Sequence, residues 1–162
     1  MAEQGLFKVL ATLRRQAGAS VGIRAAGALS DILASQRQIA AEYGEANRDA
    51  SWDDVDDPKM RKLVEEENLA REEAEYVRLR SLVTDAIQAW FMQQLLISYG
   101  ADDSSLPNPE MLNDTNCPRV STEEALQNIR YVSDFMRSLA ANVDEGLALD
   151  ALCLSLSEKV KG

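Results

Sequence analysis

Apolar side chains recur at spacings of three and four residues through nearly the whole chain, and this periodicity constrains the fold more than any other feature. Such spacing places the apolar residues on one face of an α-helix. No stretch of useful length alternates apolar and polar residues, as a half-buried β-strand would. The sequence therefore predicts an all-α protein.

The helical periodicity falls into three long segments. They cover residues 1–44, 58–100 and 122–162, and they are joined by an acidic linker over 45–57 and a surface loop over 101–121. At 1.5 Å per residue, a helix of about 40 residues spans roughly 60 Å, which is longer than a compact domain of this size. We therefore expect a single elongated helical domain over 1–162: an antiparallel helical hairpin, or three long helices in coiled-coil-like packing.

The ends of these segments carry recognisable signals. Asp57-Pro58 is typical of a helix start, and Gly100 is typical of a helix stop. The run 121–124, Ser-Thr-Glu-Glu, is a capping box that opens the third segment. Gly146 either separates two helices or is a close-packing site inside one, and we expect one C-terminal helix that bends there.

Small residues form a row at spacing four in the first segment: Gly18, Gly22, Ala26, Ser30 and Ala34. On a helix, this row makes a smooth ridge that a second backbone can approach closely. Each interior glycine costs a helix about 1 kcal/mol relative to alanine, so packing has to hold this helix in place. We therefore expect 1–44 to be an assembly helix.

The predicted assembly surface combines this ridge with large apolar residues of the central and C-terminal segments. Its residues are Gly18, Gly22, Ala26, Ser30, Ala34, Trp90, Phe91, Leu95, Leu139, Val143, Leu152 and Leu156.

Composition excludes several classes of function. The chain has 27 acidic and 17 basic residues, a net charge of -10, and no histidine. An acidic surface does not hold a nucleic-acid backbone, and without histidine the chain lacks the commonest general base and metal ligand. Neither a nucleophile with an activating base nor a phosphate-binding loop is present. We expect no catalytic site, no metal and no cofactor. Cys117 and Cys153 form no metal-binding pair, and whether they form a disulfide stays open.

The sequence also predicts neither a membrane span nor a cleaved signal peptide. The longest uncharged run, over 86–101, has 16 residues, whereas a bilayer span needs about 20. The first residues have no basic stretch followed by an apolar core. We expect synthesis in the cytoplasm, with export by a leaderless route or assembly into a particle as open alternatives.

Charge placement favours association of the helices. The two connections together carry -8 of the net charge of -10, so the helical segments are nearly balanced. We therefore expect a non-enzymatic structural subunit that self-assembles through its terminal helices into a filament, tube or ring, with the acidic connections facing water. In arrangement, the chain is similar to the leaderless filament subunits of flagellar and type III secretion systems, which pair N- and C-terminal helices. An appendage, a secretion apparatus or a virion would be an example of the setting for such a subunit.

An alternative hypothesis is a cytosolic helical adaptor or chaperone. Its partner would be another helical protein that binds an apolar helix face. That face would consist of Trp90, Phe91, Met92, Leu95 and Leu96, since methionine and aromatic side chains suit adaptable binding.

The ridge makes a testable prediction at Gly22. If a second subunit packs there, Gly22→Leu reduces assembly, because overpacking typically costs about 1–3 kcal/mol, while the helicity of the monomer stays equal or rises. Gln38→Leu is the control, and sedimentation at matched concentration is the measurement. Unchanged assembly of the Gly22 variant would remove the ridge from the interface.

Overall fold

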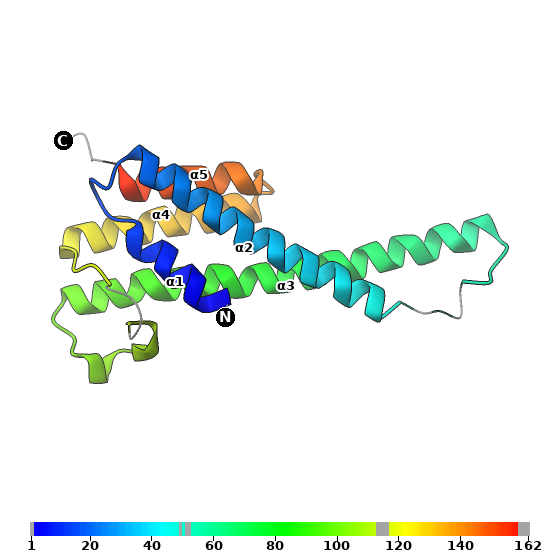
Figure 1. Cartoon of the computed structure of the whole chain (residues 1–162), viewed down its shortest axis with the longest axis horizontal. Helices are drawn as coiled ribbons and strands as arrows, with labels where there is room; N and C mark the ends of the chain where they lie inside the picture. The colour runs from blue at the N-terminus through cyan, green and yellow to red at the C-terminus, as the bar shows by residue number, and fades with distance from the viewer. Residues whose placement is uncertain (1, 49, 51–52, 113–116, 159–162) are drawn as a thin grey trace. The chain divides into compact units, whose positions relative to one another are not determined.

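A computed structural model of the 162-residue chain describes residues 2–48, 50, 53–112 and 117–158. These residues contain no strand, and the all-α class is confirmed. The helices (Figure 1) are α1 (Ala2–Thr12), α2 (Ala19–Ala46), α3 (Pro58–Ser98), α4 (Thr122–Ala140) and α5 (Glu145–Ser157), with short 3-10 turns at Asp103–Ser105 and Pro109–Leu112. Coiled-coil packing stays a prediction.

The start and end of the central helix agree with the sequence signals. α3 begins at Pro58, and the side chain of Asp57 accepts a hydrogen bond from the backbone N–H of Lys59 at 3.0 Å. After Ser98, Gly100 adopts a φ of 88°, a left-handed conformation that glycine tolerates and that ends a helix.

The predicted capping box at the start of α4 is also present in part. Ser121 is the N-cap residue, and its hydroxyl accepts a hydrogen bond from the backbone N–H of Glu124 at 3.2 Å. This bond satisfies one of the N–H groups that the first turn of a helix leaves without a partner.

The prediction of one helix over 1–44 is wrong, because the chain breaks between Thr12 and Ala19. Gln16 and Gly18 have φ values of 72° and 98°, which a right-handed helix does not contain. Tertiary hydrogen bonds hold this break. The N–H of Arg15 donates to Glu124 Oε1 at 3.0 Å, and the N–H of Gly18 donates to the Ser157 carbonyl at 2.9 Å.

The prediction of one helix over 122–162 is also wrong. α4 ends in a Schellman motif, in which Asn142 takes a φ of 56°. The N–H of Asn142 donates to the Leu139 carbonyl at 3.2 Å, and the N–H of Val143 donates to the Ser138 carbonyl at 3.0 Å.

A new cap then starts the last helix. Asp144 is the N-cap of α5, and its carboxylate accepts a hydrogen bond from the N–H of Leu147 at 3.0 Å. Gly146, where the sequence placed the bend, lies instead in the first turn of α5. The predicted end of the C-terminal helix at residue 162 lies outside the described residues.

The chain forms two compact units, and α2 and α3 contribute to both. Unit 1 consists of Met1–Ile32 and Thr84–Gly162. Within it, α4 and α5 lie side by side and antiparallel (Figure 1). Buried side chains from all five helices and from the turn after α1 form its core, and the largest include Leu10, Leu13, Leu29, Ile87, Trp90, Phe91, Val132, Leu149 and Leu156.

Unit 2, Leu33–Val83, contains the C-terminal part of α2 and the N-terminal part of α3. Its buried cluster is small and consists of Ala40, Tyr76 and Leu79. The guanidinium of Arg37 lies 3.7 Å from the centre of the Tyr76 ring, and it also contacts the carboxylate of Glu73 at 3.4 Å. Much of the contact between these two helices is therefore made by polar side chains.

The close backbone contact that the sequence predicted at Gly22 is present, but the second helix is α5 of the same chain. A Cβ atom added at Gly22 would lie 2.9 Å from the carbonyl oxygen of Cys153 and would overlap Ser157 Oγ. Ser157 Oγ donates to that same Cys153 carbonyl at 2.7 Å. Any side chain at position 22 therefore acts on the folded chain itself.

We predict opposite effects for two glycine substitutions in α2. Gly22→Ala should lower the free energy of unfolding by about 1–3 kcal/mol, because the Cys153 backbone cannot move aside easily. Gly27→Ala should raise it by up to about 1 kcal/mol, because no atom lies within 4 Å of a Cβ at that position. Urea unfolding of both variants measures the difference. Equal effects would contradict the contact.

Candidate functional site

The described residues contain no group of three or more His, Cys, Asp or Glu side chains that could hold a metal ion. None of the helices in this part of the chain is long and apolar enough to cross a membrane. The features that stand out are surfaces.

Most of the predicted assembly residues lie inside one copy of the chain. Three are exposed: Ser30, Ala34 and Val143. Two are half-buried: Gly18 and Leu95. The others are buried: Gly22, Ala26, Trp90, Phe91, Leu139, Leu152 and Leu156. Because the buried side chains already pack in unit 1, a second copy cannot reach them without unfolding.

The apolar face of α3 proposed for an adaptor also has both buried and exposed residues. Trp90 is 1 % exposed, and its ring stacks on Phe7 of α1 with the ring centres 5.6 Å apart. Phe91 is buried as well, whereas Met92 is exposed. The sequence did not show that α1 turns back after Thr12 and covers this part of α3. A glycine at position 18 could have indicated the break between α1 and α2, but it was interpreted as part of a continuous ridge.

In unit 2, the apolar residues of α3 face outward. Leu63, Ala70, Ala74 and Val77 follow one another at spacings of seven, four and three, so they share one helix face. All four are exposed, Leu63 at 57 % and Val77 at 40 %. We call these four residues the α3 stripe. The predicted assembly residues include none of these four.

Charged residues of both signs flank the α3 stripe, and on one side each arginine is paired with a glutamate, Arg71 with Glu67 and Arg78 with Glu75. Arg71 and Arg78 lie along one side, and Glu66 and Glu73 lie along the other. The members of each pair are seven residues apart, and so they repeat in step with the stripe. Glu67 also lies on this face, and Arg71 contacts its carboxylate at 3.4 Å.

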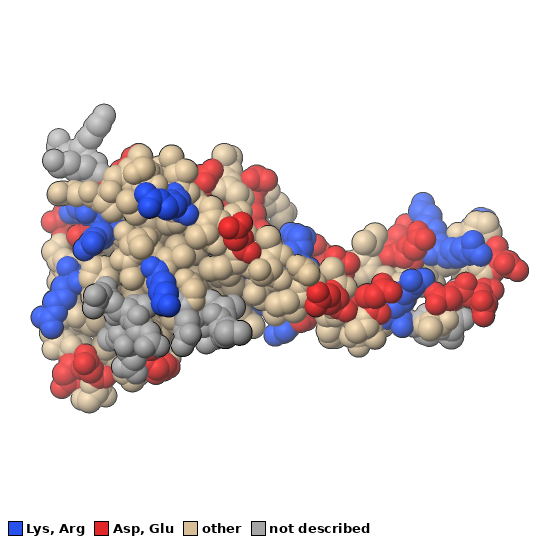
Figure 2. All heavy atoms as spheres, viewed as in Figure 1, with Lys and Arg blue, Asp and Glu red and all other residues tan. Residues whose placement is uncertain are grey.

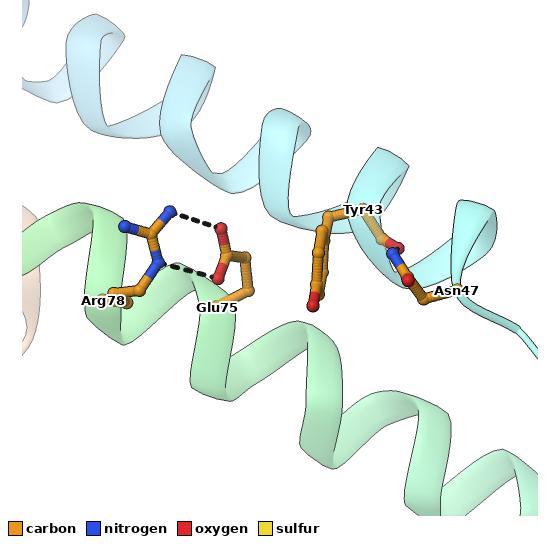
Figure 3. A network of polar contacts seen from close by, with 4 residues as sticks. All are labelled: Tyr43, Asn47, Glu75 and Arg78. Carbon is orange, nitrogen blue, oxygen red and sulfur yellow. Dashed lines mark hydrogen bonds and ion pairs between the residues drawn. The ribbon is translucent and has the colours of Figure 1, made fainter.

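The side chain of Arg78 is held in place by Glu75. Its guanidinium donates two hydrogen bonds to that carboxylate, at 2.9 and 2.7 Å (Figure 3). These bonds lower the pKa of Glu75 and raise the pKa of Arg78, so both groups stay charged. Figure 3 also shows the Tyr43 ring of α2 pointing toward α3 beside this pair. An exposed pair of this kind adds little stability, but it fixes where the charge lies.

A groove of about 320 Å³ lies between α1 and α2 in unit 1. Its lining is mostly apolar and consists of Lys8, Val9, Thr12, Val21, Arg24, Ala25 and Ala28. Lys8 and Arg24 are exposed. Neither forms an ion pair with the side chains that the structure describes.

Both cysteines are free thiols in the structure, and this answers the question the sequence left open. Cys153 is buried, and burial raises the pKa of its thiol to about 12. Burial raises the pKa of the half-buried Cys117 as well.

Comparisons with protein-family models, with curated proteins and with solved structures found no match to this chain. Its function is therefore inferred from its own burial, charge and surface pattern.

We predict that Cys153 makes stability fall at alkaline pH. The thiol has an ordinary pKa of 9.0 in the unfolded chain and about 12 in the folded one. Between these values the unfolded chain loses the proton while the folded chain keeps it, so the free energy of unfolding falls as pH rises. Urea unfolding at about pH 8 and about pH 10.5 should show a smaller fall for Cys153→Ala than for the parent. The less buried Cys117→Ala is the control, and a fall as large in Cys153→Ala as in the parent would contradict the prediction.

Proposed function

We propose that the protein is a non-enzymatic structural subunit that associates with a second copy of itself through the α3 stripe. The observation that carries this proposal is the exposure of Leu63, Ala70, Ala74 and Val77 on one face of α3. The sequence-based hypothesis of self-assembly is retained. The surface differs, because most of the residues first expected to form it are buried in unit 1.

The hydrophobic effect supports this choice of surface. Burying apolar area stabilises an association by roughly 25 cal/mol per Å², and a helix pair buries such a stripe when its spacing follows a seven-residue repeat. Among the described residues of unit 2, Ala40, Tyr76 and Leu79 form a small buried cluster. A second copy packed on the α3 stripe would add the apolar contacts that a two-helix unit lacks.

The flanking charges favour a parallel pair. When two copies of α3 run in the same direction around a two-fold axis, the Arg71 and Arg78 side of one copy meets the Glu66 and Glu73 side of the other. In an antiparallel pair, each side would meet its own kind, and like charges would face each other. The second copy is therefore expected to be parallel at this contact.

Growth beyond a pair needs a second contact. A two-fold interface is closed, because the same patch is used on both copies. A filament, tube or ring would use another surface, and Ser30, Ala34 and Val143 of the predicted assembly set are exposed for it. Charges of both signs are interleaved over the surface of unit 2 (Figure 2), and this would keep an assembled particle in water.

We predict that the double substitution Leu63→Gln and Val77→Gln weakens self-association by about tenfold or more, because it removes apolar area from the contact. The fold should be unaffected, since both side chains are exposed. Leu69→Gln is the matched control, because Leu69 is 65 % exposed on the same helix but lies off the stripe. Sedimentation velocity over a concentration series measures the effect. A parent chain that stays monomeric, or equal weakening by the control, would refute the proposal.

We predict that single cysteines report the orientation of the pair. In a Cys117→Ser background, Leu63→Cys and Val77→Cys should each form a disulfide with their own kind on mild oxidation, because a parallel pair places equivalent positions side by side. Non-reducing electrophoresis measures the cross-link. Cross-linking only when the two variants are mixed would show an antiparallel pair instead.

A further inference from the structure

We infer that the groove between α1 and α2 is a docking site for an acidic amphipathic helix of a partner protein. This inference goes beyond self-association and does not depend on it. The groove lies in unit 1, whereas the α3 stripe lies in unit 2.

The floor of the groove is apolar and formed by small side chains. Val9 contributes from α1, and Val21, Ala25 and Ala28 contribute from α2. Short side chains leave a recess of about 320 Å³ between the two helices. A partner helix can place apolar residues from successive turns into such a recess, as in helix-in-groove recognition.

The charge around the groove specifies the partner. Lys8 and Arg24 border it from two different helices, and neither is paired with a described acidic side chain. The lining of the groove contains these two basic side chains and no acidic one, in a chain whose net charge is -10. This face is therefore locally cationic on an acidic protein. Complementary charge on the partner would steer its approach and fix its register.

Figure 2 shows this distribution over α1 and the start of α2. Lys and Arg side chains stand apart from one another in a mostly uncharged surface. The spacing of the cations leaves uncharged surface between them. An occupant that fits this surface has an apolar face with acidic residues along its edges.

Two other anionic occupants fit less well. A nucleic acid would meet the overall charge of -10, which opposes phosphate binding. A fatty acid needs an enclosed cavity that covers its whole chain, but this groove is bordered by the exposed side chains of Lys8, Thr12 and Arg24. A helix needs only one covered face, and so it suits an open groove.

The test uses a fluorescein-labelled synthetic peptide of about 18 residues, with leucine at positions i, i+3, i+4 and i+7 and glutamate at the flanking positions. Fluorescence anisotropy should show saturable binding that weakens as salt increases. The variant Lys8→Glu with Arg24→Glu should bind the peptide at least about tenfold more weakly. Arg130→Glu is the control for charge, because Arg130 is exposed on α4 and does not line the groove.

A second variant tests the recess itself. Ala28 is half-buried and lines the groove, so Ala28→Phe should fill it and reduce peptide binding at least about tenfold while leaving the helical circular dichroism unchanged. The same binding should persist in the Leu63→Gln/Val77→Gln variant, and this separates failure here from failure of self-association.

Several results would overturn the inference. They are the absence of binding of the glutamate peptide at about 1 mM, equal binding by a peptide with the same composition in scrambled order, and equal binding by the Lys8→Glu/Arg24→Glu variant. Binding of oleate at the groove in preference to the peptide would show that the occupant is a lipid.

Discussion

The fold of unit 1 depends on the close approach of α2 and α5 at Gly22. A residue with a Cβ does not fit there without a shift, because its Cβ would lie 2.9 Å from the Cys153 carbonyl oxygen. Hydrogen bonds beside this contact join the start of α2 to the end of α5. The N–H of Gly18 binds the Ser157 carbonyl, and the Ser157 hydroxyl binds the Cys153 carbonyl. Once α5 is held against the start of α2, the tight Schellman turn before it places α4 alongside.

A different face of α2 lines the open groove beside α1. Gly22 and Ala26 are buried, and Gly22 is used for the contact with α5. Val21, Ala25 and Ala28 lie on the face turned toward α1 and line the recess with it. Small residues in α2 therefore have two effects. On one face they allow close contact with α5, and on another they leave a gap beside α1.

Local signals were sufficient to predict the fold class and the two best-capped helix starts. Pro58 and Ser121 mark these positions through side-chain and backbone chemistry that acts within one turn.

The breaks near Gly18 and Asn142 were missed because apolar periodicity continues across both. Each break is stabilised by backbone hydrogen bonds, and at Gly18 the partner is distant in sequence. The same limit applies to the site. Periodicity identified the small-residue ridge, but it cannot tell which apolar face another part of the same chain will cover.

The α3 stripe and the groove between α1 and α2 differ in charge, and this difference decides which of them suits a symmetric pair. A two-fold pair brings equivalent surfaces together, so a patch suited to self-association needs both signs of charge placed to meet each other. The α3 stripe has them, with Arg71 and Arg78 on one side and Glu66 and Glu73 on the other. The groove between α1 and α2 is bordered by cations alone, so two such grooves brought together would repel each other. Unlike the stripe, the groove therefore favours a different, acidic partner, and a chain that uses both surfaces can pair with itself and hold that partner at the same time.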